Sequence, residues 1–160
     1  MSFAWALLAL IALAAAATLA LRAYRRALAA GLIGEICETL TLIESHDVEA
    51  GLARCSEALG DGGAAPNLPT LPTLSYRGEM AGMALIGAHR ARLAAGFYAA
   101  AEALHGELSD LAAAAPGPAR GERVRNATRE LQRTFDLGDE TLRALRDVIA
   151  PRRRRLLSRA

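Results

Sequence analysis

The residues in this chain that could do chemistry are three histidines, two cysteines and a run of arginines near the C-terminus. His46, His89 and His105 lack a His or Cys three or four residues away, so no helix face pairs two metal ligands. The sequence contains no G-x-S-x-G motif, and its spacings define no Ser-His-Asp set. We therefore predict no catalytic residue, no metal site and no cofactor, and we identify no small-molecule substrate.

The cysteines, Cys37 and Cys55, lie in apolar stripes, where a cysteine usually serves as a small hydrophobic side chain. Two cysteines do not make a disulfide scaffold, and in a cytoplasmic protein they remain reduced. Each is nine residues from His46, so a turn there would bring them to the same level. The glycines of segment 60–63 fit neither a dinucleotide-binding motif nor a P-loop and predict a flexible loop.

The C-terminal arginines have a clearer physical consequence. Arg152, Arg153, Arg154 and Arg155 are adjacent, and each could gain about 1 kcal/mol beside an anionic lipid leaflet. Nucleic acid is a weaker candidate partner because no aromatic side chain for base stacking lies nearby. We predict lipid or anion contact for this tail, and a purely solvated basic tail is the alternative.

Charge is unevenly distributed although the formal net charge is only +2. All 19 basic residues are arginines, whose planar guanidinium suits phosphate or carboxylate. They are concentrated in segment 111–160, whereas segment 35–61 is acidic. We expect the acidic side chains of this middle segment to form a solvated face: Glu35, Glu38, Glu44, Asp47, Glu49 and Glu57.

The N-terminal segment has the composition of a membrane span. From Phe3 to Leu21, through Trp5 and Leu10, the chain carries no charge. As a helix it would be about 28 Å long, which matches the bilayer core. Its leucines, isoleucine and phenylalanine favour insertion by roughly 2 to 5 kcal/mol. This segment is therefore predicted to be a transmembrane helix in contact with membrane lipids.

Arginines follow the predicted span at once and indicate its orientation. Arg22, Arg25 and Arg26 form a cluster that the positive-inside rule assigns to the cytoplasm. This predicts a single-pass protein of the bacterial inner membrane with its C-terminal domain in the cytoplasm. A cleaved signal peptide is the competing interpretation, because Ala14–Ala17 offers processing sites. The length of the apolar run and the absence of a preceding basic residue favour the anchor.

Small residues recur along the predicted span. Ala12, Ala16 and Ala20 are spaced four apart, which lets a second helix approach closely. General alanine richness would produce the same spacing by chance. We interpret the stripe as a candidate helix-contact face for a protein partner or a second copy of the chain.

Beyond the span, periodicity predicts helices throughout. A stripe from Leu28 to Ile43 continues the membrane helix to about Ser45, where Ser45-His46-Asp47 predicts a turn. A second helix from Val48 should end at Gly60. The next helix is predicted to begin at Thr73 or Ser75 and to carry Tyr76, Met80 and Met83, with a kink or separation at Gly87.

The strongest periodic signal begins at Ala88. Its heptad-like stripe consists of Leu93, Phe97, Ala101, Leu104, Leu108 and Leu111. We predict that Leu93, Phe97, Leu104 and Leu108 contact a partner if their own helical neighbour leaves part of the stripe open. Pro116-Gly117-Pro118 should end this helix.

The last third should contain two helices. One is expected from Arg120 to Phe135, and Asp136-Leu137-Gly138-Asp139 predicts a break before a short helix that Pro151 ends. The predicted fold class is all-α: a transmembrane helix continuing into an antiparallel helical hairpin or small bundle. The predicted units are an anchor at 1–27, a hairpin domain at 28–115 with a Gly/Pro loop at 60–74, a basic helical segment at 116–150 and a disordered tail at 151–160.

The order of these features resembles a loose class of short bacterial single-span membrane proteins with a cytoplasmic helical hairpin. The residues that carry the likeness are Phe3–Leu21, Arg22, Arg25, Arg26, Leu28–Ile43, Leu68-Pro69-Thr70-Leu71-Pro72-Thr73, Tyr76 and Phe97-Tyr98. The resemblance implies the same architecture over residues 1–111 and brings no established activity. We expect a non-enzymatic, membrane-tethered interaction protein. The alternatives are a periplasmic or phage-type envelope protein and an anionic-lipid or nucleic-acid binder acting through its C-terminus.

Overall fold

A computed structural model describes residues 3–57, 65–67, 74–78 and 80–150 of the chain. Within these ranges the regular structure is entirely helical, which confirms the predicted all-α class. The predicted disordered tail at 151–160, and most of the predicted Gly/Pro loop, lie outside the described residues.

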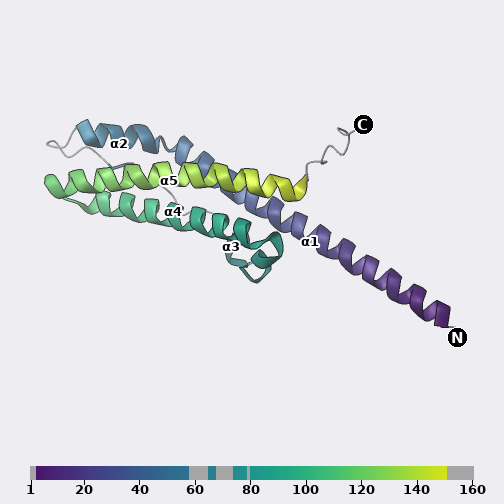
Figure 1. The fold of residues 1–160 in the computed structure, drawn as a ribbon. Coiled ribbons are helices and arrows are strands. Elements are labelled where there is room, and N and C mark those ends of the chain that lie inside the picture. Colours follow the sequence, from purple (N-terminus) through teal and green to yellow (C-terminus); the bar gives the residue numbers. More distant parts are fainter. Residues whose placement is uncertain (1–2, 58–64, 68–73, 79, 151–160) are drawn as a thin grey trace, which may run out of the picture.

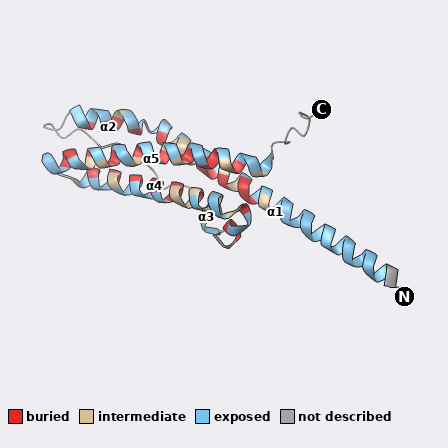
Figure 2. Ribbon diagram, in the orientation of Figure 1, coloured by how far each residue is buried: buried red, intermediate tan, exposed pale blue. Residues whose placement is uncertain are grey.

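The first helix, α1, runs unbroken from Phe3 to Ser45. Its 43 residues make a rod about 65 Å long, of which the N-terminal half extends away from the other helices (Figure 1). Residues 5–24 are all exposed, and burial in the bundle begins at Leu28 (Figure 2). The predicted continuation of the apolar segment into the helical domain is therefore confirmed.

The turn predicted after Ser45 is also present. Asp47 has a φ of 51°, a left-handed conformation that ends α1 and redirects the chain into α2, Val48–Glu57. The backbone N–H of His46 still bonds to the Leu42 carbonyl at 3.1 Å, and the Gly51 N–H bonds to the Asp47 carbonyl at 2.8 Å. Backbone hydrogen bonds are therefore retained on both sides of the turn. Helix α2 extends the bundle beyond the end of α1.

The segment before the long helices differs from its prediction. Instead of one α-helix carrying Tyr76, Met80 and Met83, the chain forms a five-residue helix, α3 (Leu74–Gly78), and a 3-10 segment, η1 (Met80–Ile86). Gly87, with a φ of 99°, then separates η1 from α4, Ala88–Ala113. A positive φ of this kind is cheap for glycine alone, which explains why the separation falls there.

The two longest bundle helices form an antiparallel pair. Helix α5 runs from Pro118 to Ile149, and Gly117 and Pro118 supply the turn and the first helical residue after α4. Arg120 helps to close this turn because its Nη1 donates a 3.0 Å hydrogen bond to the Ala114 carbonyl. The break predicted at Pro116-Gly117-Pro118 is confirmed.

The break predicted at Asp136–Asp139 is wrong, since α5 passes through these residues without interruption. Gly138 lies on the buried side, and a Cβ built there would meet Leu40 Cδ1 at 3.1 Å and Phe97 Cε2 at 3.2 Å. The glycine therefore permits close approach of α1 and α4 to α5. Packing on both sides overrides the local tendency of this sequence to form a turn.

Helix α5 is the centre of the bundle. It packs against α4 along most of its length and also contacts α1 and α2, running antiparallel to α1 and α4 (Figure 1). The segments on either side of residues 115/116 therefore pack against each other.

The core has two parts that follow each other along the bundle. The part near the protruding half of α1 contains Leu32, Ile36, Phe97 and Leu145. The far part includes Ile43, Leu52, Leu104, Leu111 and Leu131. Leu28 is the first buried residue of α1, and it belongs to the same part of the core as Ile86 of η1.

Candidate functional site

The most conspicuous surface of the molecule is the protruding half of α1. Its large apolar side chains are exposed, including Trp5 at 67%, Leu10 at 64%, Leu13 at 68% and Leu21 at 45%. Soluble monomers rarely expose a contiguous apolar patch of more than a few hundred Å². A window of this helix has a mean hydropathy of 2.1, and none of it is buried in the bundle. The helix is long and apolar enough to span a membrane.

The arginines predicted to set the membrane orientation lie at the base of this protruding helix, where it enters the bundle. Arg22 and Arg26 are exposed and Arg25 is half-buried, and burial of α1 begins two residues after Arg26. The candidate helix-contact residues Ala12, Ala16 and Ala20 are all exposed on the protruding half. The apolar helix and the start of the bundle are therefore separated by a narrow arginine band.

The other predicted contact surface is not available. Phe97, Leu104 and Leu108 are 0%, 0% and 3% exposed, because the stripe of α4 lies in the two parts of the core together with side chains of α1, α2 and α5. Leu93 is half-buried. The periodic stripe was correctly assigned to a helical interface, but that interface lies within the chain. The predicted lipid contacts Arg152, Arg153, Arg154 and Arg155 lie outside the described residues.

A buried polar cluster was missed by sequence reasoning. Glu35, expected on a solvated acidic face, is only 8% exposed. Its Oε2 accepts a 2.8 Å hydrogen bond from the Tyr98 hydroxyl and a 3.2 Å hydrogen bond from the backbone N–H of Tyr76. The rings of Tyr76 and Tyr98 stack with centroids 4.1 Å apart. Burial, and then the hydrogen bond to Glu35, raise the pKa of Tyr98 well above its usual value.

This cluster joins three segments of the chain. The carboxylate comes from α1, the hydroxyl from α4 and the backbone donor from α3. A buried carboxylate is stable only when donors surround it, so the arrangement fixes α3 against the long helices. The other acidic residues named with Glu35 are exposed, as expected: Glu38, Glu44, Asp47, Glu49 and Glu57.

Arginines line a cleft beside the root of the protruding helix. The arginine cleft is formed by Arg22, Arg25, Arg26, Arg90, Asp147 and Val148, and its volume is about 330 Å³. Arg90, from the first turn of α4, is held in place because its Nε donates to the Ala144 carbonyl at 2.8 Å and its Nη1 to the Ile86 carbonyl at 3.1 Å. Sequence reasoning found the three arginines of α1 but not Arg90, whose partners are set by tertiary packing.

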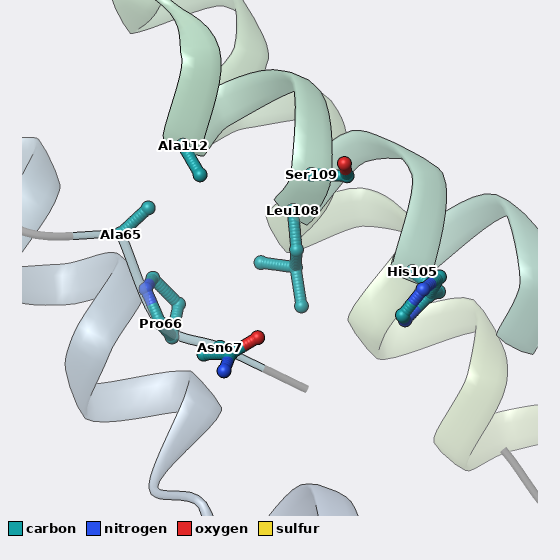
Figure 3. A pocket seen from close by; sticks show the side chains of 7 residues that line it. All are labelled: Ala65, Pro66, Asn67, His105, Leu108, Ser109 and Ala112. Atoms are coloured by element: carbon teal, nitrogen blue, oxygen red, sulfur yellow. The ribbon is translucent and has the colours of Figure 1, made fainter. Parts of the chain in front are cut away.

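A second hollow, of about 270 Å³, lies at the far end of the bundle between Pro66 and α4 (Figure 3). Leu108 points toward Pro66 and Asn67, while the ring of His105 lies apart from the Ser109 hydroxyl (Figure 3). No hydrogen bond joins His105 to Ser109 among the described residues, so the pair lacks the contact that an activated nucleophile needs.

A shallow groove of about 440 Å³ runs between α2 and α5. Leu52, Val124 and Leu131 form its apolar floor, and Glu49 and Arg125 are among the polar residues beside it. Its apolar side chains belong to the far part of the core, and all three are at most 5% exposed. The groove therefore offers little apolar surface.

The described residues contain no group of three His, Cys, Asp or Glu side chains that could hold a metal ion. Cys37 is exposed and Cys55 is buried, and no disulfide joins them. Comparison of the chain with protein-family models, with curated proteins and with solved structures gave no match.

Proposed function

We propose that this chain is a non-enzymatic, membrane-tethered helical protein that acts by helix–helix contact, as an accessory or scaffold subunit of a membrane assembly. The proposal depends on the exposed apolar half of α1. Trp5, Leu10 and Leu13 are each more than 60% exposed on a helix that no other part of the described chain covers. Insertion into lipid removes this surface from water and is favoured by roughly 2 to 5 kcal/mol.

The proposed orientation places the bundle in the bacterial cytoplasm, with the protruding helix in the inner membrane. Support comes from Arg22, Arg25 and Arg26, which follow the apolar segment directly. Positively charged residues flanking a single span are retained on the cytoplasmic side. A periplasmic envelope protein is the competing candidate, since the same helix can serve as an uncleaved signal-anchor.

The two cysteines make the orientation measurable in the natural chain. Cys37 is exposed on α1, and Cys55 is buried in the core, so a thiol reagent should label Cys37 first. A membrane-impermeant maleimide should label Cys37 in inverted vesicles and leave it unlabelled in intact spheroplasts. The Cys37→Ala variant is the control for background. Equal labelling in intact spheroplasts would place the bundle on the periplasmic side and overturn the cytoplasmic orientation.

The proposed contact face is the alanine stripe of the span. Ala12, Ala16 and Ala20 are exposed, and close packing of small residues is a major source of helix association in lipid. Such contact would join α1 to a partner helix or to a second copy of the chain. Ala16→Leu should reduce recovery of crosslinked partners or dimers from membranes, whereas Leu13→Ile should not. Unchanged recovery with Ala16→Leu would remove this face from the proposal.

A further inference from the structure

The residues of the arginine cleft come from α1, the start of α4 and the end of α5. These parts of the helices lie at the end of the bundle from which the apolar helix emerges (Figure 1). We propose that it binds the phosphate of an anionic phospholipid in the leaflet adjoining the bundle. This inference rests on the proposed membrane insertion of α1. It goes further because it assigns a defined lipid site to residues of α1, α4 and α5 together.

The distance of the cleft from the end of the membrane span matches the position of the lipid phosphates. The span ends at Leu21, and Arg22 to Arg26 occupy the next helical turn, about 6 Å of rise. The polar layer on each side of a bilayer core is roughly 5 to 8 Å thick. The guanidiniums of Arg22, Arg25 and Arg26 therefore lie within the layer that contains the phosphates.

The cleft also has the charge that a phosphate requires. Four arginines and one acidic residue, Asp147, are among its described lining residues. The Nε of Arg25 is buried and has no hydrogen-bond partner within the described part of the chain. A buried donor without an acceptor is costly, and a phosphate oxygen in the cleft would supply one.

Hydrogen bonds to the backbone hold Arg90 in a fixed position in the cleft. Its Nε and Nη1 are bound to the carbonyls of Ala144 and Ile86, so the side chain is fixed between α5 and the end of η1. A fixed guanidinium loses little conformational freedom when it binds an anion. The arginines of α1 that line the same cleft supply further donors for the phosphate.

Exposed apolar residues adjacent in sequence to the residues of the cleft favour a lipid over a soluble anion. Beyond the predicted span Phe3–Leu21, the large apolar residues found exposed in the described chain are Tyr24, Leu85 and Ile149. Tyr24 lies between Arg22 and Arg25, Leu85 precedes the Ile86 that holds Arg90, and Ile149 follows the Val148 that lines the cleft. An interface with acyl chains and headgroups accommodates this combination of apolar and basic groups.

The test is native mass spectrometry of the full-length chain in detergent, titrated separately with phosphatidylglycerol, phosphatidylcholine and inorganic phosphate. The test variant is Arg25→Gln with Arg26→Gln, which retains Arg22. The matched control is Arg125→Gln with Arg129→Gln, which removes the same charge from exposed positions of α5 in the other half of the bundle. Deletion of residues 151–160 separates the cleft from the arginine-rich tail.

Phosphatidylglycerol should bind more tightly than phosphatidylcholine. The test variant should weaken its binding by roughly fivefold for each guanidinium removed, about 25-fold in all. The control variant and the tail deletion should stay within about twofold of the natural chain if the two sites are independent.

Equal binding of the two lipids, or equal loss in the test and control variants, would overturn the lipid site. Inorganic phosphate that binds as tightly as phosphatidylglycerol would instead identify a soluble anion as the ligand. Loss of lipid binding only on tail deletion would also overturn it. Each of these results leaves the membrane insertion of α1 intact, because insertion is measured by the detergent requirement of the chain.

Discussion

The Tyr98 hydroxyl donates a 2.8 Å hydrogen bond to Oε2 of Glu35, across 63 residues of chain. This bond connects the buried part of α1, after Leu28, with the first half of α4. The Glu35 carboxylate is almost completely buried and also accepts the Tyr76 N–H. One side chain thus provides polar contacts to both α4 and the short α3.

We expect Tyr98→Phe to lower the free energy of unfolding by about 1 to 3 kcal/mol. The substitution removes a donor from a buried carboxylate, which then lacks compensation for the loss of water. The measurement is denaturant unfolding of the detergent-solubilised chain. Tyr24→Phe is the matched control, because Tyr24 is 41% exposed. A change below about 0.5 kcal/mol for Tyr98→Phe would contradict a stabilising contribution from this bond.

The same bond predicts a dependence of stability on high pH. Burial and Glu35 raise the pKa of Tyr98 in the folded chain, whereas in the unfolded chain it titrates near 10.0. Above that pH the unfolded state loses a proton that the folded state retains, so the contribution of Tyr98 falls as pH rises. Below that pH its contribution is complete.

Unfolding midpoints at pH 8, 10 and 11 should therefore converge for the natural chain and Tyr98→Phe. The natural chain should have its full advantage at pH 8 and a smaller one at pH 11. An advantage that stays constant over this range would show that the Tyr98 pKa is not raised by folding.

Gly138 provides a test of the packing at the centre of the bundle. Because a Cβ at this position meets Leu40 and Phe97 at 3.1 to 3.3 Å, Gly138→Leu should overpack the core and cost about 1 to 3 kcal/mol or more. Gly106→Leu is the matched control, since Gly106 is a helical glycine with nothing within 4 Å of its Cβ position. That variant should be neutral or stabilising by up to about 1 kcal/mol. Equal effects on the unfolding midpoint would contradict the close approach at Gly138.

A charge placed in the span tests the insertion energetics. Leu13→Arg replaces a residue near the middle of the apolar segment and should disfavour insertion by about 3 to 4 kcal/mol. This is comparable with the whole insertion free energy, so the membrane-bound fraction should fall sharply when cell fractions are immunoblotted. Ala53→Arg, on the exposed surface of α2, should leave that fraction unchanged. Retention of Leu13→Arg in the membrane would mean that α1 is held by something other than its own hydrophobicity.

Local signals predicted much of the fold. The apolar run and its continuation to Ser45, the turn at Asp47 and the break at Pro116 to Pro118 depend on residues adjacent in sequence. The continuity of α5 at Gly138 was not predictable, since the glycine looks like a helix breaker unless Leu40 and Phe97 are known to lie against it. Tertiary packing decides such positions.

The candidate sites divide in the same way. Arg22, Arg25 and Arg26 are recognisable because they directly follow an apolar segment. Glu35 looked like a solvated acid, because its partners are 41 and 63 residues away and neither has a sequence signature. Arg90 was not identified, because one of the two carbonyls that hold it belongs to Ala144, 54 residues later. Long-range partners of this kind become visible only once the helices are packed.

Membrane tethering by α1 can be measured by alkaline carbonate extraction of membranes containing the natural chain, followed by intact-mass analysis of both fractions. If α1 tethers the protein, the chain stays in the membrane pellet, requires detergent for release, and has a mass that includes residues Phe3–Leu21. Release into the aqueous fraction, or a mature chain that begins at residue 18 or beyond, would contradict membrane tethering by α1.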